Sequence, residues 1–181
     1  DGDKAMAITV NSKTHRTGVC NAMETLLVDS RSAEQLLPAV GQALAEKGVE
    51  MRSCPQAKAI LGDLAVEATN EDWDTEYLDL ICSVRVVDGV EGALEHINRH
   101  GSGHTECIVT EDEATARRFQ LEADTSTVFW NASTRFSDGG EFGMGAEIGI
   151  STDKIGARGP MGLAELTTYK WLGEGAGLTR A

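Results

Sequence analysis

The sequence of 181 residues has no long apolar run, no basic stripe and no amino-terminal segment that is first charged and then apolar. A membrane-spanning helix needs about 20 mostly apolar residues, so we expect no membrane span, and no secretory leader is indicated. The chain carries 29 acidic and 16 basic residues, a net charge of −13, and has little with which to neutralise nucleic-acid phosphates. We therefore expect neither a membrane nor a nucleic acid as partner.

The four cysteines are far apart and never occur in a CxxC pair. In a chain without a secretory leader, this spacing favours a reduced protein of the cytoplasm over a disulfide scaffold. Cys20, Cys54, Cys82 and Cys107 are therefore expected to be free thiols.

The length is sufficient for one domain with a buried core, or for one domain with an appendage. Residues 1–10 have the pattern of a helix already inside a domain and include no initiator methionine. We expect the chain to be the carboxyl-terminal part of a longer protein.

Strand-like and helix-like segments alternate along the sequence, which predicts an α/β fold with a largely parallel sheet. Helices are expected at residues 3–13, 32–47, 57–61, 89–100 and 113–121. Strands are expected at residues 23–28, 49–52, 64–67, 77–87, 107–110 and 127–131.

Cys20 is the first candidate for chemistry, because it lies between a polar turn and the strand predicted at residues 23–28. A thiolate at such an edge is open to an electrophilic carbonyl and is supported by a rigid element, as covalent catalysis requires. Most free cysteines are instead small buried hydrophobic residues, so position alone does not decide the role.

Several segments, in this order along the chain, resemble those of the γ-glutamyl phosphate reductase family, a branch of the aldehyde dehydrogenase superfamily. They are Asn11-Ser12-Lys13-Thr14 leading to Cys20, Gly101-Ser102-Gly103-His104-Thr105-Glu106, Asn131-Ala132-Ser133-Thr134-Arg135-Phe136, Asp138-Gly139-Gly140-Glu141-Phe142-Gly143 and Ala157-Arg158-Gly159-Pro160-Met161-Gly162.

The resemblance implies a three-layer catalytic domain of the aldehyde dehydrogenase type over residues 1–162. It implies that residues 163–181 form a carboxyl-terminal segment that returns toward the cofactor domain or a subunit interface. The NADPH-binding half of such enzymes lies mostly before the catalytic cysteine, so it is expected to be absent here, and this chain alone is expected to be inactive.

The resemblance also implies a reaction. Cys20 would attack the acyl carbon of γ-glutamyl phosphate, phosphate would leave, and NADPH would reduce the resulting thioester to the aldehyde, a step of proline biosynthesis. The backbone N–H of Cys20 would help to stabilise the oxyanion, and Asn21 flanks the site. A partner kinase, glutamate 5-kinase, would make the acyl phosphate, and the full-length enzyme is expected to be a homo-oligomer.

Glu76 and three arginines complete the expected site. By the resemblance, Glu76 would accept hydroxyl hydrogen bonds from the nicotinamide ribose, although a solvated glutamate in an acidic run is an equal alternative. Arg16, Arg135 and Arg158 are candidates for binding the anionic substrate, because a guanidinium holds a carboxylate or phosphate in bidentate fashion. Arg135 is the best placed of the three, although an arginine considered alone is more often an ordinary surface residue.

Two alternatives remain open. Another aldehyde or acyl-phosphate dehydrogenase of the superfamily would use the same thiol on a different substrate. A zinc-stabilised, non-catalytic module could use His96, His100, His104 and Cys107, although no standard zinc pattern is matched, and we expect no metal. The glycine-rich residues 143–149 lack the spacing and the preceding strand of a dinucleotide loop, so they are not assigned to NADPH.

Overall fold

The computed structural model describes residues 1–181 and contains a four-stranded, wholly parallel sheet in the order β1-β4-β2-β3. The predicted α/β fold with a parallel sheet is thus confirmed. The strands are β1 (Thr25–Asp29), β2 (Glu50–Ser53), β3 (Ala65–Glu67), β4 (Ile81–Val87), β5 (Thr105–Ile108), β6 (Thr127–Trp130), β7 (Gly149–Ser151) and β8 (Gly159–Met161). The helices are α1 (Gly2–Thr14), α2 (Ala33–Glu46), α3 (Pro55–Leu61), α4 (Gly89–His100) and α5 (Glu113–Glu122), with 3₁₀ turns at Gly62–Leu64, Glu71–Asp74, Thr134–Phe136 and Ala164–Leu166.

The central strand β4 separates two unlike faces of this sheet. Cys82 and Val84 are fully buried on the face covered by α2 and α3, where they join the main hydrophobic core with Leu44 of α2. The alternate residues Ser83 and Arg85 point to the opposite face, where they contact the segment at residues 71–77 and α4. Helices on both faces make this part of the molecule three-layered.

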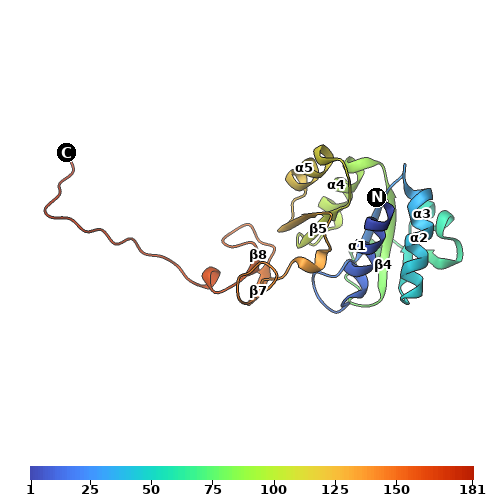
Figure 1. Cartoon of the computed structure of the whole chain (residues 1–181), viewed down its shortest axis with the longest axis horizontal. Helices are drawn as coiled ribbons and strands as arrows, with labels where there is room; N and C mark the ends of the chain where they lie inside the picture. The colour runs from blue at the N-terminus through green and yellow to red at the C-terminus, as the bar shows by residue number, and fades with distance from the viewer.

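Helix α1 packs beside α2 (Figure 1), with Met6 and Val10 against the main core, and it has a second face that is polar. Its buried residues are Thr9, Ser12 and Lys13, and the Lys13 side chain is completely excluded from solvent. Because α1 leads directly to Cys20, this polar face contacts the segments that surround the thiol and not only the core.

A second parallel pair, β5 and β6, is separate from the main sheet. The helices α4 and α5 cover it and form a smaller core in which Leu94, Phe119 and Ala123 are buried. The sequence predicts both strands but does not indicate that the sheet is divided into two parts.

The strand predicted at residues 77–87 is too long at its start, because β4 begins at Ile81. Leu78 has φ +54°, and the Tyr77 hydroxyl is directed toward Asp72 and Ser83. This hydrogen bonding turns residues 77–80 into a loop, although their side chains have strand propensity.

The carboxyl-terminal part contains an element that the sequence does not predict, the antiparallel pair β7 and β8. Beyond it, residues 163–181 run away from the body of the molecule as an extended tail (Figure 1). Tyr169, Trp171, Leu172 and Leu178 are each about 80% or more exposed in this tail. No helix of the structure is both long enough and apolar enough to cross a membrane.

Candidate active site

Cys20 lies exposed in the turn that joins α1 to β1. The base of this turn is closed by a backbone hydrogen bond of 3.0 Å from Met23 N to Ser12 O, and by the ion pair of 3.0 Å between Lys13 Nζ and Glu24 Oε2. The ends of the turn are therefore fixed, while the thiol at its tip remains accessible.

Asn21 connects this turn to residues far along the chain. Its side-chain Nδ2 donates to the carbonyl of Ser137 over 3.0 Å, and its own carbonyl accepts from Thr134 Oγ1 over 2.7 Å. Asn21 is only 6% exposed, and its Oδ1 has no partner within the chain. The segment at residues 133–137, where the sequence predicts a substrate-binding arginine, is thereby held beside the thiol.

The thiol opens into a cleft of about 1070 Å³. Asn21, Glu76, His104 and Thr134 line this cleft together with Cys20. The structure thus brings Glu76, predicted as a cofactor contact, to the same cleft as the predicted nucleophile.

Several groups act on the pKa of the Cys20 thiol, and together they raise it above the ordinary value for cysteine. Partial burial of the sulfur raises this pKa most, while the backbone N–H of Cys20 lowers it. The charges of Glu147 and Glu76 raise it further, and that of Arg135 lowers it. Without further ligands the thiol is therefore largely protonated at neutral pH.

We expect the alkylation rate of Cys20 at pH 7.5 to respond to these charges in opposite directions. Glu147→Gln should accelerate alkylation and Arg135→Gln should slow it, each by roughly two- to threefold, because charges near solvent interact weakly. Mass spectrometry of the alkylated peptide measures both rates. Equal rates in the two variants and the parent would show that neither charge acts on the sulfur.

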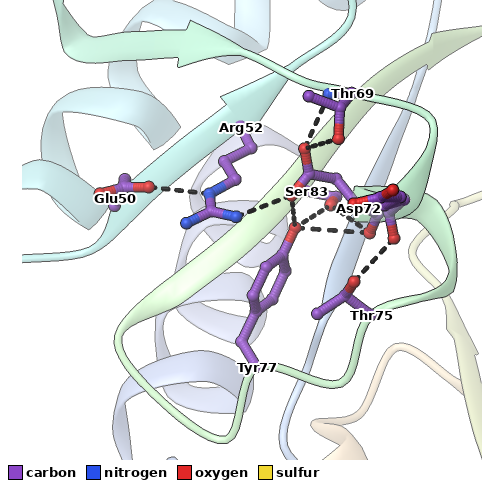
Figure 2. A network of polar contacts seen from close by, with 8 residues as sticks. Glu50, Arg52, Thr69, Asp72, Thr75, Tyr77 and Ser83 are labelled. Carbon is purple, nitrogen blue, oxygen red and sulfur yellow. Dashed lines mark hydrogen bonds and ion pairs between the residues drawn. The ribbon is translucent and has the colours of Figure 1, made fainter.

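The segment that carries Glu76 is held by the buried carboxylate of Asp72 (Figure 2). Arg52 Nη1 and the Tyr77 hydroxyl each donate to Asp72 Oδ1 over 2.8 Å, and the backbone N–H of Thr69 donates to Oδ2 over 2.7 Å. Burial alone would raise the pKa of Asp72, but these hydrogen bonds outweigh it and hold the pKa well below its usual range. Burial also raises the pKa of Tyr77, to about 12.

Asp72→Asn should lower the free energy of unfolding by about 2 kcal/mol at pH 7, because a charged acceptor of several hydrogen bonds is lost. The folded pKa of Asp72 is depressed, so its contribution is present above the ordinary Asp pKa and is lost as the pH falls toward the folded value. The difference in the free energy of unfolding between Asp72→Asn and the parent should therefore become smaller below about pH 4. Urea denaturation at pH 7 and pH 3 measures this difference in the free energy of unfolding. Glu71→Gln, which changes an exposed neighbouring carboxylate, is the matched control.

The three predicted arginines are not brought together. Arg135 lies within charge range of Cys20, and its Nε donates to His15 Nδ1 over 3.3 Å. Arg16 is exposed and does not line the cleft. Arg158 also lies outside the cleft lining, and its Nη1 forms an ion pair of 3.2 Å with Asp124.

The four side chains of the alternative zinc module do not converge, and no group of three or more His, Cys, Asp or Glu side chains is arranged to hold a metal ion. Each has a separate partner: His96 with Arg85, His100 with Asp74, His104 with Thr105, and Cys107 with the carbonyl of Ala132.

Two residues near the thiol were not among the predicted site residues. Glu147 reaches the site from the glycine-rich segment, where its Oε2 accepts from Gly139 N over 2.8 Å. His104 lines the same cleft, and the sequence places it both in a segment that resembles the reductases and among the residues of the alternative zinc module. The signals that could have revealed them were a single carboxylate among glycines and the His104 segment that resembles the reductases.

The geometry is that of an α/β domain with a thiol at the end of a helix-to-strand turn, and comparison with solved structures identifies the class. An acetylating aldehyde dehydrogenase from Geobacillus thermoglucosidasius aligns over the whole chain and 49% of its own length, with TM-score 0.73 and 19% identity. The fold is therefore of the aldehyde dehydrogenase type.

More similar proteins identify the family, although no protein-family model matches the chain. The γ-glutamyl phosphate reductases of Moorella thermoacetica and Thermus thermophilus are 56% and 55% identical over 180 residues, which is 99% of this chain and 43% of each relative. The crystal structure of the Thermotoga maritima γ-glutamyl phosphate reductase superposes on the whole chain and 44% of its own length, with TM-score 0.96 and 49% identity. The chain belongs to the γ-glutamyl phosphate reductase family and spans less than half the length of these relatives.

Proposed function

We propose that this chain is the thiol-bearing part of an enzyme that reduces L-glutamyl 5-phosphate to L-glutamate 5-semialdehyde and phosphate in proline biosynthesis. The observation that carries the proposal is the 55–56% identity, over nearly the whole chain, with relatives named γ-glutamyl phosphate reductase. A cysteine that is exposed to a large cleft supports it chemically.

Cys20 is the proposed nucleophile. Its thiolate attacks the acyl carbon, the carbon–oxygen bond to the phosphoryl group breaks, and phosphate leaves with the electron pair to give a thioester. The backbone N–H of Cys20, which lowers the pKa of its own thiol, is the proposed donor to the oxyanion of this step. Asn21 holds the turn against Ser137 and so fixes the position of the nucleophile.

NADPH is the proposed cofactor, and when bound it supplies the hydride that converts the thioester to the aldehyde. The chain offers Glu76, an exposed carboxylate in the cleft beside Cys20, to accept hydrogen bonds from ribose hydroxyls. The Asp72 network restrains the loop that carries Glu76, so the backbone at this position is held before the cofactor binds. The rest of the NADPH site is expected outside this chain.

Arg135 is the best-supported contact for the substrate α-carboxylate, because it acts on Cys20 from the substrate-side segment. Arg16 and Arg158 remain proposed contacts, but Arg158 would first have to release Asp124.

We also propose that residues 1–162 form the catalytic domain, and that residues 163–181 use their exposed aromatic side chains at the cofactor domain or at the interface of a homo-oligomer. The enzyme is proposed to act in the cytoplasm on acyl phosphate supplied by glutamate 5-kinase.

The test is phosphate-dependent oxidation of glutamate 5-semialdehyde by the full-length enzyme that contains this chain. The proposal requires that NADPH formation depends on inorganic phosphate and yields the acyl phosphate. Oxidation to free glutamate without phosphate would instead assign the chain to a hydrolytic aldehyde dehydrogenase. A stoichiometric zinc ion in the purified protein would favour the non-catalytic module.

A further inference from the structure

His104 is held rigidly between the end of α4 and the start of β5. Its carbonyl accepts from the backbone N–H of Thr127 over 3.1 Å and from the Ser126 hydroxyl over 2.5 Å. The preceding Gly103 has φ +71°, a backbone conformation that residues with a side chain rarely adopt. The glycine therefore allows the tight turn before His104. The backbone of His104 is therefore fixed relative to the strand pair β5–β6.

The ring has one satisfied nitrogen and one free nitrogen. Nδ1 lies 2.6 Å from Thr105 Oγ1. The residue is only 7% exposed, yet Nε2 has no hydrogen-bonding partner within the chain although the side chain lines the cleft of Cys20. A buried polar atom without a partner is unfavourable for folding, and at a functional cleft its persistence indicates a ligand.

The surroundings indicate which hydrogen-bonding role Nε2 has. Burial lowers the pKa of His104, so the ring is neutral at physiological pH. Glu76 lines the same cleft as His104 and Cys20, and the charges of Glu76 and Glu147 act on both the imidazole and the thiol. Those negative charges favour a ring N–H directed at the cleft over a lone pair, and the Thr105 hydroxyl can donate to Nδ1.

We propose that His104 Nε2–H binds the phosphoryl group of the acyl phosphate while Cys20 attacks the adjacent carbon. The proposal rests on the proposed function, because only an acyl-phosphate substrate carries phosphoryl oxygens at the reacting carbon. The backbone N–H of Cys20 serves the carbonyl oxygen, and Arg135 is available for the distant α-carboxylate. A neutral donor also suits a phosphate that must leave after the carbon–oxygen bond breaks.

The test compares two variants of the full-length enzyme in phosphate-dependent oxidation of glutamate 5-semialdehyde. His104→Asn keeps a polar group near the Nδ1 position, while His104→Gln places an amide N–H near the Nε2 position. We expect His104→Asn to raise the KM for inorganic phosphate about tenfold, as loss of one hydrogen bond implies, and His104→Gln to restore most of that loss. The KM for the semialdehyde should be unchanged in both variants.

Three other results would overturn the assignment: an unchanged KM for phosphate in His104→Asn, equal effects of Asn and Gln, or an increase confined to the KM for the semialdehyde. Thermal unfolding of both variants shows whether either has a folding defect. The ratio of the KM for phosphate to the KM for the semialdehyde can still be compared in that case, because it does not depend on the fraction of enzyme that is folded. If the parent enzyme shows no phosphate-dependent oxidation at all, the proposed function fails. If the parent is active while His104→Asn binds phosphate normally, only the role of His104 fails.

Discussion

Cys20→Ser is expected to reduce the turnover of the full-length enzyme by about a thousandfold or more. A serine hydroxyl ionises at a far higher pH than a thiol and is the weaker nucleophile, so much less of the reactive anion is available in the variant. The substitution is nearly isosteric, and Cys20 is exposed, so the fold should be unaffected. Steady-state oxidation of glutamate 5-semialdehyde with phosphate measures the effect.

Cys54→Ser is the matched control for this experiment. Cys54 lies outside the cleft at the amino terminus of α3, where its sulfur accepts from Ala57 N over 3.5 Å. Serine is a favoured residue at this position, so stability and turnover should stay within about twofold of the parent. Normal turnover in Cys20→Ser would show that the nucleophile is elsewhere.

Much of the fold could be predicted, because the spacing of apolar residues along the sequence indicates which side of a helix or strand is buried. The helix predicted at residues 89–100 matches α4, and the strand predicted at residues 127–131 differs from β6 by one residue. The start of β4 could not be predicted, because Tyr77, Leu78 and Leu80 favour a strand but are turned away by the hydrogen bond of the Tyr77 hydroxyl to Asp72. Strands β7 and β8 have three residues each, too few for a periodic signal.

The site shows a similar division between local and distant information. The turn containing Cys20 could be recognised from its own residues, and family resemblance indicated Glu76 and Arg135, which lie within charge range of the thiol. The proximity of Glu147 to the thiol depends on how the loop at residues 137–149 folds back, and that of His104 on how β5 and β6 pair, so neither contact could be derived from local residues alone. Resemblance alone also could not reveal that Arg158 is engaged with Asp124.

The second large effect is expected at the buried ion pair between Lys13 and Glu24. The Lys13 side chain has no solvent exposure and that of Glu24 has 20%. Burial raises the pKa of Glu24, and the hydrogen bond and charge of Lys13 oppose this shift. The other carboxylate oxygen of Glu24 accepts from Leu78 N over 3.3 Å, so the pair links the Cys20 turn to the segment that carries Glu76.

Lys13→Met should lower the free energy of unfolding by about 3 kcal/mol at pH 7, because methionine fills a similar volume but leaves a partly buried carboxylate unpaired. Without Lys13 the folded pKa of Glu24 rises further. A carboxyl with a raised folded pKa is relatively stabilising when protonated and loses that contribution as the pH rises. The defect of Lys13→Met should therefore shrink between pH 7 and pH 4, as urea denaturation at several pH values can measure.

The double variant Lys13→Met/Glu24→Gln separates loss of the ion pair from loss of packing. Glutamine keeps an oxygen that can accept from Leu78 N but removes the unpaired charge. If the defect is electrostatic, the double variant should be more stable than Lys13→Met at pH 7 and should show little dependence on pH. Additive losses would instead mean that the two side chains stabilise the fold independently. The turn that presents Cys20 would then be held by the backbone bond from Met23 to Ser12 and by the contacts of Asn21, without a contribution from the ion pair.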